Sequence, residues 1–274
     1  MGAPRSDRSP DALPGLWALA VAVAGTVAMW KGMVYGRGLG LDLRQTLLVG
    51  ELLLVGPGLL ALALARLPLV ASLHLNPGGR RTTLLAVAGG GVFWGTSYGL
   101  LELQNAFWPP APGYLEGFRR LLEALRPTGP LDWAFSLAAI AVAPAVAEEV
   151  LSRGIVLPSL RGPLGDGGAV AASAVVFGLM HLDPYRLPFT VMMGLALGTL
   201  RVRTGSLVPG ILAHATLNAL TFTAAPFLDD AAQAVPDPRP LLGAAVLLVG
   251  GALSVLLITR FPLTPTQPPP KLSP

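Results

Sequence analysis

Eight apolar runs, separated by short segments rich in Arg, Pro or Gly, constrain the fold of this chain more than any other feature of its sequence. They cover residues 16–30, 47–65, 83–103, 131–151, 167–182, 187–200, 207–222 and 241–258. A membrane-spanning helix needs about 20 mainly apolar residues, because lipid cannot hydrogen-bond an exposed backbone. We therefore predict an all-α fold, a polytopic integral membrane helical bundle with about eight transmembrane helices.

The composition agrees with a membrane protein. Only 12% of the residues are charged and 53% are hydrophobic, whereas soluble domains are about one-quarter charged. The chain has no cysteine, which excludes thiol nucleophiles, disulfides and thiolate metal sites. A net charge of +4 fits arginines at an anionic membrane surface better than a nucleic-acid footprint, so we expect no nucleic-acid partner.

The same pattern divides the chain into three parts. Residues 1–15 form a polar N-terminal segment, residues 16–260 a single multi-span membrane domain, and residues 261–274 a Pro-rich, disordered tail. Lys and Arg are distributed over the loops so that both termini are expected in the cytoplasm. Between the third and fourth runs, Leu115, Phe118, Leu122 and Leu125 recur at helical spacing. They predict an amphipathic helix that lies either on the membrane surface or against the protein.

Two adjacent carboxylates end the fourth apolar run, in the sequence Pro-Ala-Val-Ala-Glu-Glu-Val-Leu-Ser-Arg at 144–153. A charged side chain inside a bilayer costs at least ~2.5–3.5 kcal/mol, so such groups usually pair, face water or have a function. Glu149 and Arg153 share a helical face and should form an ion pair, whereas Glu148 points about 100° away and stays free to react. Pro144 cannot donate to the carbonyl of Ile140, so the helix should loosen before the acidic pair.

Two of the three histidines lie in apolar runs, and each has a partner four residues away. Phe177 precedes His181 and Asn218 follows His214, so each pair shares one helical face. These groups suit amide hydrolysis, in which Glu148 takes a proton from a water that His181 holds while His214 and Asn218 donate to the oxyanion. The same glutamate and histidines could instead hold zinc. No HExxH motif is present, so no cofactor is favoured and zinc is the alternative.

Other functions remain open. Ser97 lies in Gly-Thr-Ser-Tyr-Gly at 95–99, which matches the G-x-S-x-G pattern of serine hydrolases and makes a serine-type intramembrane protease an alternative. The pattern needs a strand-turn-helix elbow, whereas this run is helical and its glycines fit close helix packing. A membrane transporter or a proton- or cation-binding module would use the same buried ionisable residues. Glu51 and Glu102 also lie in or near spans, without an identifiable partner.

The three polar motifs, taken together, resemble those of the CPBP intramembrane proteases, also called Abi, a family that contains the type II CAAX prenyl endopeptidases. The motifs are Glu148-Glu149-x-x-x-Arg153, Phe177-x-x-x-His181 and His214-x-x-x-Asn218. They occur in this order on separate predicted helices, within a motif-bearing core at 131–222.

The resemblance implies a helical bundle with a central polar cavity and cleavage of a peptide bond near the membrane face, by a glutamic-type or a metalloprotease mechanism. It implies that Glu148, His181, His214 and Asn218 are catalytic, and that the remaining motif residues support them. The substrate would be a membrane-associated protein or peptide: a prenylated CAAX tail, a leader peptide or a C-terminal sorting signal. The protein would reside in the bilayer of the bacterial inner membrane.

Overall fold

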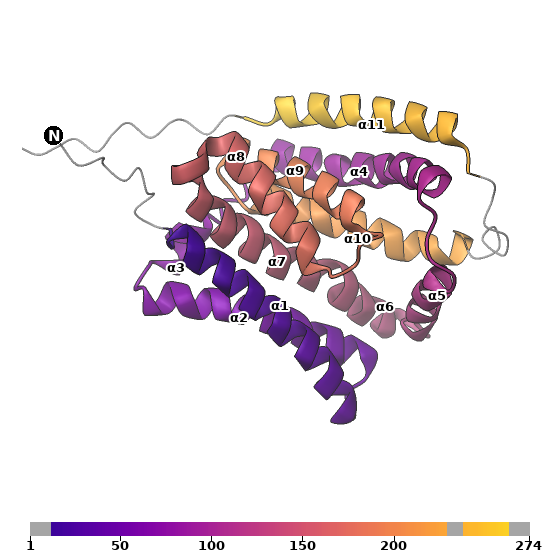
Figure 1. The fold of residues 1–274 in the computed structure, drawn as a ribbon, viewed down its shortest axis with the longest axis horizontal. Coiled ribbons are helices and arrows are strands. Elements are labelled where there is room, and N and C mark those ends of the chain that lie inside the picture. Colours follow the sequence, from indigo (N-terminus) through magenta and orange to yellow (C-terminus); the bar gives the residue numbers. More distant parts are fainter. Residues whose placement is uncertain (1–11, 229–237, 263–274) are drawn as a thin grey trace, which may run out of the picture.

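The computed structural model describes residues 12–228 and 238–262, and its regular elements in these ranges are all helical (Figure 1). The α-helices are α1 (Gly15–Gly38), α2 (Leu43–Leu64), α3 (Leu69–Leu73), α4 (Arg80–Phe107), α5 (Tyr114–Ala124), α6 (Pro130–Leu137), α7 (Ala143–Glu149), α8 (Leu157–Met180), α9 (Leu187–Thr204), α10 (Val208–Leu228) and α11 (Pro240–Arg260). Two π-helical segments, η1 (Ala138–Val142) and η2 (Val150–Val156), join α6, α7 and the start of α8 without a break. All eight predicted runs are helical, which confirms the fold class of a helical membrane protein.

Within the described residues, five helical stretches are long and apolar enough to cross a membrane: α1, α2, α4, α11 and the kinked stretch from Pro130 to Met180. That stretch contains two of the predicted spans. Gly165 separates them, because its φ of 66° and ψ of 177° break the helix in a conformation that glycine adopts readily. The predicted spans at 187–200 and 207–222 form α9 and α10, which are not among these five stretches. Both carry polar side chains that are buried in the bundle, among them Arg201 and His214.

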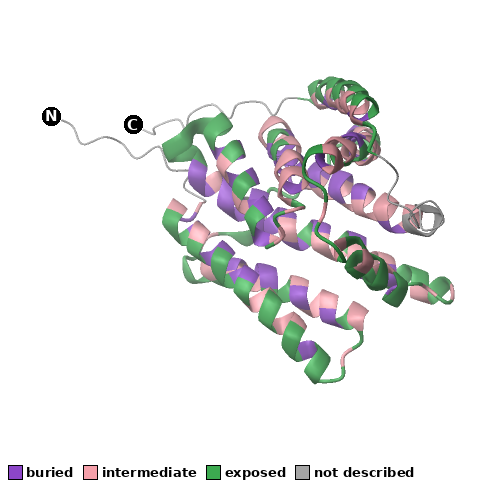
Figure 2. Ribbon diagram, turned by 45° about the vertical axis from the view of Figure 1, so that its right-hand side comes forward, coloured by how far each residue is buried: buried purple, intermediate pink, exposed green. Residues whose placement is uncertain are grey.

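The helices pack in three groups (Figure 1). α1 and α2 form a pair on one side, α4 and α11 form a pair on the other, and α7 to α10 lie between them. Figure 2 shows the buried residues concentrated along the central helices, with exposed residues on the outer faces. The motif-bearing helices therefore lie in the middle of the bundle.

Glycines allow the closest helix contacts. A Cβ on Gly99 of α4 would lie 2.6 Å from the backbone nitrogen of Leu247 on α11. A Cβ on Gly194 of α9 would lie 2.8 Å from Cα of Ala174 on α8. Real Cβ atoms do not approach backbone this closely, so both positions require glycine for the observed packing. This agrees with the small-residue interfaces typical of membrane helices.

The predicted boundaries at the two ends of the chain lie partly outside the described residues. The expected polar segment 1–15 is described only from residue 12, and the expected disordered tail 261–274 only to residue 262. Phe261, at the start of that tail, is buried in the core formed by α4, α9 and α10. Its carbonyl also accepts a hydrogen bond from Nε of Arg203 at 3.2 Å. The ordered fold therefore includes at least this residue.

Candidate active site

The acidic pair lies where the helical segment α7 gives way to the π-helical segment η2. α7 is a seven-residue α-helix between the two π-helical segments η1 and η2, and Glu148 and Glu149 are its last residues. Pro144 stands in the first turn of α7, directly after the π-helical segment η1, which agrees with the predicted loosening of the helix before the pair. The sequence did not predict the second π-helical segment, η2. π-Helical turns inside α-helices occur frequently at functional sites.

Arg153 ties the acidic pair to two other helices. As its spacing predicted, it pairs with Glu149, and Nη1 lies 2.7 Å from Oε1 with both side chains almost completely buried. Nη2 donates to the carbonyl of Gly194 on α9 at 3.1 Å. The guanidinium carbon lies 4.4 Å from the ring centroid of Phe177 on α8, a cation–π arrangement. One buried cation therefore fixes the relative positions of the acidic segment, α8 and α9.

Phe177 also contacts both intramembrane histidines. Its ring lies edge-on to that of His181, with centroids 5.0 Å apart, and edge-on to that of His214, with centroids 6.1 Å apart. Phe177 itself is completely buried. Sequence spacing had indicated only that Phe177 and His181 share a face. The structure adds that the same ring contacts both imidazoles and the guanidinium of Arg153.

His214 of α10 contacts both carboxylates of α7. Its Nε2 lies 3.8 Å from Oε2 of Glu148, and its Nδ1 lies 3.3 Å from Oε1 of Glu149. Because Glu149 is ion-paired with Arg153, it is an ionised carboxylate and can only accept hydrogen bonds. Nδ1 of His214 therefore carries the proton that it donates to Glu149. Gly210, one turn earlier on α10, leaves room for this contact, because a Cβ there would lie 3.2 Å from Oε2 of Glu149.

His181 and Asn218 lie at the partly buried edge of this group. His181 directly follows α8, and its Nδ1 is 2.9 Å from the carbonyl of Phe177. Asn218 lies one turn beyond His214 on α10. The contacts found among the described residues join Glu148 to His214, not to His181. The pairing of Glu148 with His181, and the catalytic roles of all four residues, stay predictions.

A third carboxylate lies near the pair. This is Glu51 of α2, for which the sequence offered no partner. The Oε2 atoms of Glu51 and of Glu148 are both buried without a hydrogen-bond partner. The two side chains also interact electrostatically. By contrast, Glu102 has a hydrogen-bond partner, because its Oε2 accepts from the backbone nitrogen of Arg239 at 2.8 Å. Glu51 lies outside the sequence motifs, so only its place in an apolar run marked it as unusual.

The described donor set does not fit a zinc site. Zinc in hydrolases is held by three protein ligands at about 2.0–2.2 Å. No group of three His, Asp or Glu side chains within residues 12–228 and 238–262 is close enough to share a metal ion. In addition, Nδ1 of His181 is engaged by the carbonyl of Phe177 and Nδ1 of His214 by Glu149. We therefore derive no step through a metal, and metal independence stays a prediction.

The serine alternative gains no support from the geometry. Ser97 lies inside α4, and its hydroxyl donates to the carbonyl of Trp94 in the same helix at 2.6 Å. A serine nucleophile of the G-x-S-x-G type needs a sharp strand-to-helix turn that exposes its hydroxyl. The helical backbone here provides no such turn. The hydroxyl instead satisfies a carbonyl of its own helix.

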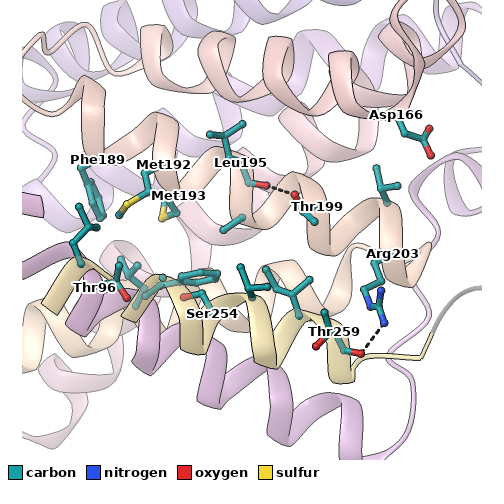
Figure 3. A pocket seen from close by; sticks show the side chains of 18 residues that line it. Thr96, Asp166, Phe189, Met192, Met193, Leu195, Thr199, Arg203, Ser254 and Thr259 are labelled. Carbon is teal, nitrogen blue, oxygen red and sulfur yellow. Dashed lines mark hydrogen bonds between the residues drawn. The ribbon is translucent and has the colours of Figure 1, made fainter. Parts of the chain in front are cut away.

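A large cavity lies away from the motif residues. It has a volume of about 740 Å³ and lies mainly between α4, α9 and α11 (Figure 3). Its walls are mostly apolar, with Phe93, Phe189 and Met193 among the lining residues. Arg203 closes one end by donating to the carbonyl of Thr259 at 2.7 Å. This cavity is not the central polar cavity expected from the resemblance, which stays a prediction.

The fold and the buried polar group define the class of this protein: a multi-span helical membrane protein whose ionisable residues converge inside the bundle. Residues 130–220 match the family model of the type II CAAX prenyl endopeptidase Rce1-like proteins. The match covers all three motifs and confirms the resemblance to the CAAX-type intramembrane proteases. Searches of curated proteins and of solved structures gave no match.

Proposed function

We propose that this chain is an intramembrane endopeptidase in which Glu148 activates water. One observation carries the proposal: Oε2 of Glu148 is buried without a hydrogen-bond partner, 3.8 Å from Nε2 of His214, inside the segment that matches the protease family. An unpaired carboxylate in an apolar bundle is costly and is usually retained for function. Its position next to an imidazole suits proton transfer.

The reaction can be written with the residues of this chain alone. Glu148 takes a proton from a water molecule that His181 helps to orient, and the resulting hydroxide attacks the carbonyl carbon of the substrate. The oxyanion of the tetrahedral intermediate accepts hydrogen bonds from His214 and Asn218. Glu148 then returns the proton to the leaving amine as the carbon–nitrogen bond breaks. The carboxylate is regenerated and one water has been consumed.

The contacts of His214 restrict its form in this mechanism. Its Nδ1 donates to Glu149, so Nε2 can donate to an oxyanion only when the ring is doubly protonated. The negative charge of Glu149 stabilises such an imidazolium. Arg153, Glu149 and His214 would then form an alternating series of positive, negative and positive charge. We propose this series as the support for the oxyanion site.

The substrate would be a membrane-associated protein or peptide. The matched family acts on CAAX tails, as its name states, so a prenylated CAAX tail is the first candidate. Leader peptides and C-terminal sorting signals are the other candidates. We propose the bacterial inner membrane as the location of the enzyme.

The proposal is tested by cleavage of a membrane-anchored peptide, with purified protein in lipid nanodiscs. Glu148→Gln should lower kcat by about 10²–10⁴-fold, the usual contribution of a general base. Asp166→Asn is the matched control, because Asp166 is an exposed carboxylate paired with Arg161. It should retain wild-type activity. Full activity in Glu148→Gln would remove Glu148 from the mechanism.

Metal dependence is tested on the same preparation. After treatment with a strong chelator and removal of bound metal, verified by elemental analysis, the protein should cleave the peptide at its original rate. Loss of activity that zinc restores would replace the glutamic-type mechanism with a metalloprotease mechanism.

A further inference from the structure

The amphipathic helix α5 has an apolar face that the described protein covers only in part. All of its residues are described, and none is buried. Leu115, Phe118 and Leu121 lie on one side of the helix and are 44%, 40% and 38% exposed. The sequence left two places for this helix, the membrane surface or the body of the protein. The exposure of these three side chains favours the membrane surface.

Both ends of α5 are nevertheless fixed to the bundle. At its start, the hydroxyl of Tyr114 donates to Oδ2 of Asp183 at 2.7 Å, and the rings of Tyr114 and Tyr185 are 4.8 Å apart. Burial raises the pKa of the Tyr114 phenol, so it remains a donor. Beyond its end, Leu125 is buried, and its carbonyl accepts from Nη2 of Arg44 at 3.2 Å. The exposed part of the apolar face is therefore held in a defined position.

The elements around α5 indicate what contacts the exposed part of its apolar face. The helix connects α4 with the helical stretch Pro130–Met180, which begins with α6. Both are apolar enough to cross the membrane, and α5 runs across their ends (Figure 1). Trp108, just after α4, is 50% exposed, and Trp133, in the first turns of α6, is 37% exposed. Exposed tryptophans at the ends of spans are typical of the boundary between lipid tails and headgroups. α5 therefore lies at the depth of this boundary.

The charged side chains of α5 fit the same position. Glu116 accepts from both Arg119 and Arg120, on the side of the helix away from Phe118. Such a helix buries its apolar side among the first acyl carbons and keeps its charged side among the headgroups. The paired charges leave little net charge to attract a soluble acidic partner.

We propose that α5 is an interfacial helix that inserts Leu115, Phe118 and Leu121 into the lipid boundary and, through Tyr114, fixes the turn that carries His181 at the membrane face. Asp183, which accepts the hydrogen bond from the Tyr114 hydroxyl, lies two residues after His181. Its Oδ1 also accepts from the backbone nitrogen of Tyr185 at 3.0 Å, so it organises the turn between α8 and α9. The positioning of the His181 turn rests on the proposed function, whereas the insertion of α5 into the lipid boundary does not.

Site-directed spin labelling tests the insertion directly. The chain has no cysteine, so Phe118→Cys and Glu123→Cys each give one labelling site, on the apolar and the charged face of α5. In phosphatidylcholine nanodiscs, the label at 118 should be more accessible to oxygen, and the label at 123 more accessible to a water-soluble nickel complex. Greater nickel access at 118 would overturn the insertion. Spin–spin broadening at 118 would also overturn it, because a second copy of the chain would then cover the face.

Tyr114→Phe tests the link to the catalytic turn. It removes the bond to Asp183 but keeps the ring that contacts Tyr185. We expect the accessibility of a label at 118 to stay unchanged and kcat for the anchored peptide to fall about tenfold, as the loss of one hydrogen bond allows. Unchanged kcat in an active wild-type background would overturn the link. Because labelling needs no activity, failure of the insertion and failure of the protease assignment are distinguishable.

Discussion

Nε2 of His214 lies 3.8 Å from Oε2 of Glu148, across the contact between α10 and α7. The other nitrogen of the same ring lies 3.3 Å from Oε1 of Glu149. One imidazole thus contacts a carboxylate that is held by Arg153 and a carboxylate that has no hydrogen-bond partner. This asymmetry separates a structural acid from an acid that is available for reaction.

His214→Ala should lower kcat by about 10²–10³-fold, the usual effect of removing an oxyanion donor. KM should change little, because the contact forms mainly in the transition state. Steady-state kinetics with a membrane-anchored peptide measures both constants. A rise in KM with kcat unchanged would assign His214 to substrate binding instead.

Arg153→Met should destabilise the protein by about 3–5 kcal/mol, because it leaves Glu149 as an unpaired buried charge. It also removes the hydrogen bond to Gly194 and the contact with Phe177. Thermal unfolding in detergent, followed by circular dichroism, measures the loss. Arg161→Met is the control: this arginine forms an exposed pair with Asp166, and such pairs contribute about 0–1 kcal/mol. Equal Tm values for the two variants would contradict the structural role of Arg153.

Ser97→Ala should retain wild-type cleavage activity, because the hydroxyl is bonded within its own helix. A fluorophosphonate probe should likewise leave Ser97 unmodified, as read by mass spectrometry. Loss of activity together with a labelled Ser97 would restore the serine-type mechanism.

Glu51→Gln should raise the Tm and lower the cleavage rate. Oε2 of Glu51 is buried without a hydrogen-bond partner, and a neutral amide of the same shape is less costly to bury than a carboxylate. An unpaired ionisable side chain retained inside a membrane protein indicates a function. Thermal unfolding and peptide cleavage on one preparation give both quantities. A higher Tm with unchanged activity would show that Glu51 has no part in the reaction.

Much of the site could be predicted because it is local in sequence. Glu149 and Arg153 are four residues apart, so any helix places them side by side. The position of Pro144 predicted the loosened turn before the acidic pair. The membrane fold followed from the apolar runs, because a bilayer permits few other structures for them.

The remaining contacts depend on how separate helices are rotated and packed. Sequence spacing shows which residues share a face of one helix, but not which face of a neighbour it meets. The contact between Glu148 and His214, the cation–π contact of Phe177 with Arg153 and the approach of Glu51 all join different helices. The exposure of apolar side chains on α5 likewise depends on how the helices pack. Helical periodicity determined the faces of each helix, and only the packing of the bundle decided what each face contacts.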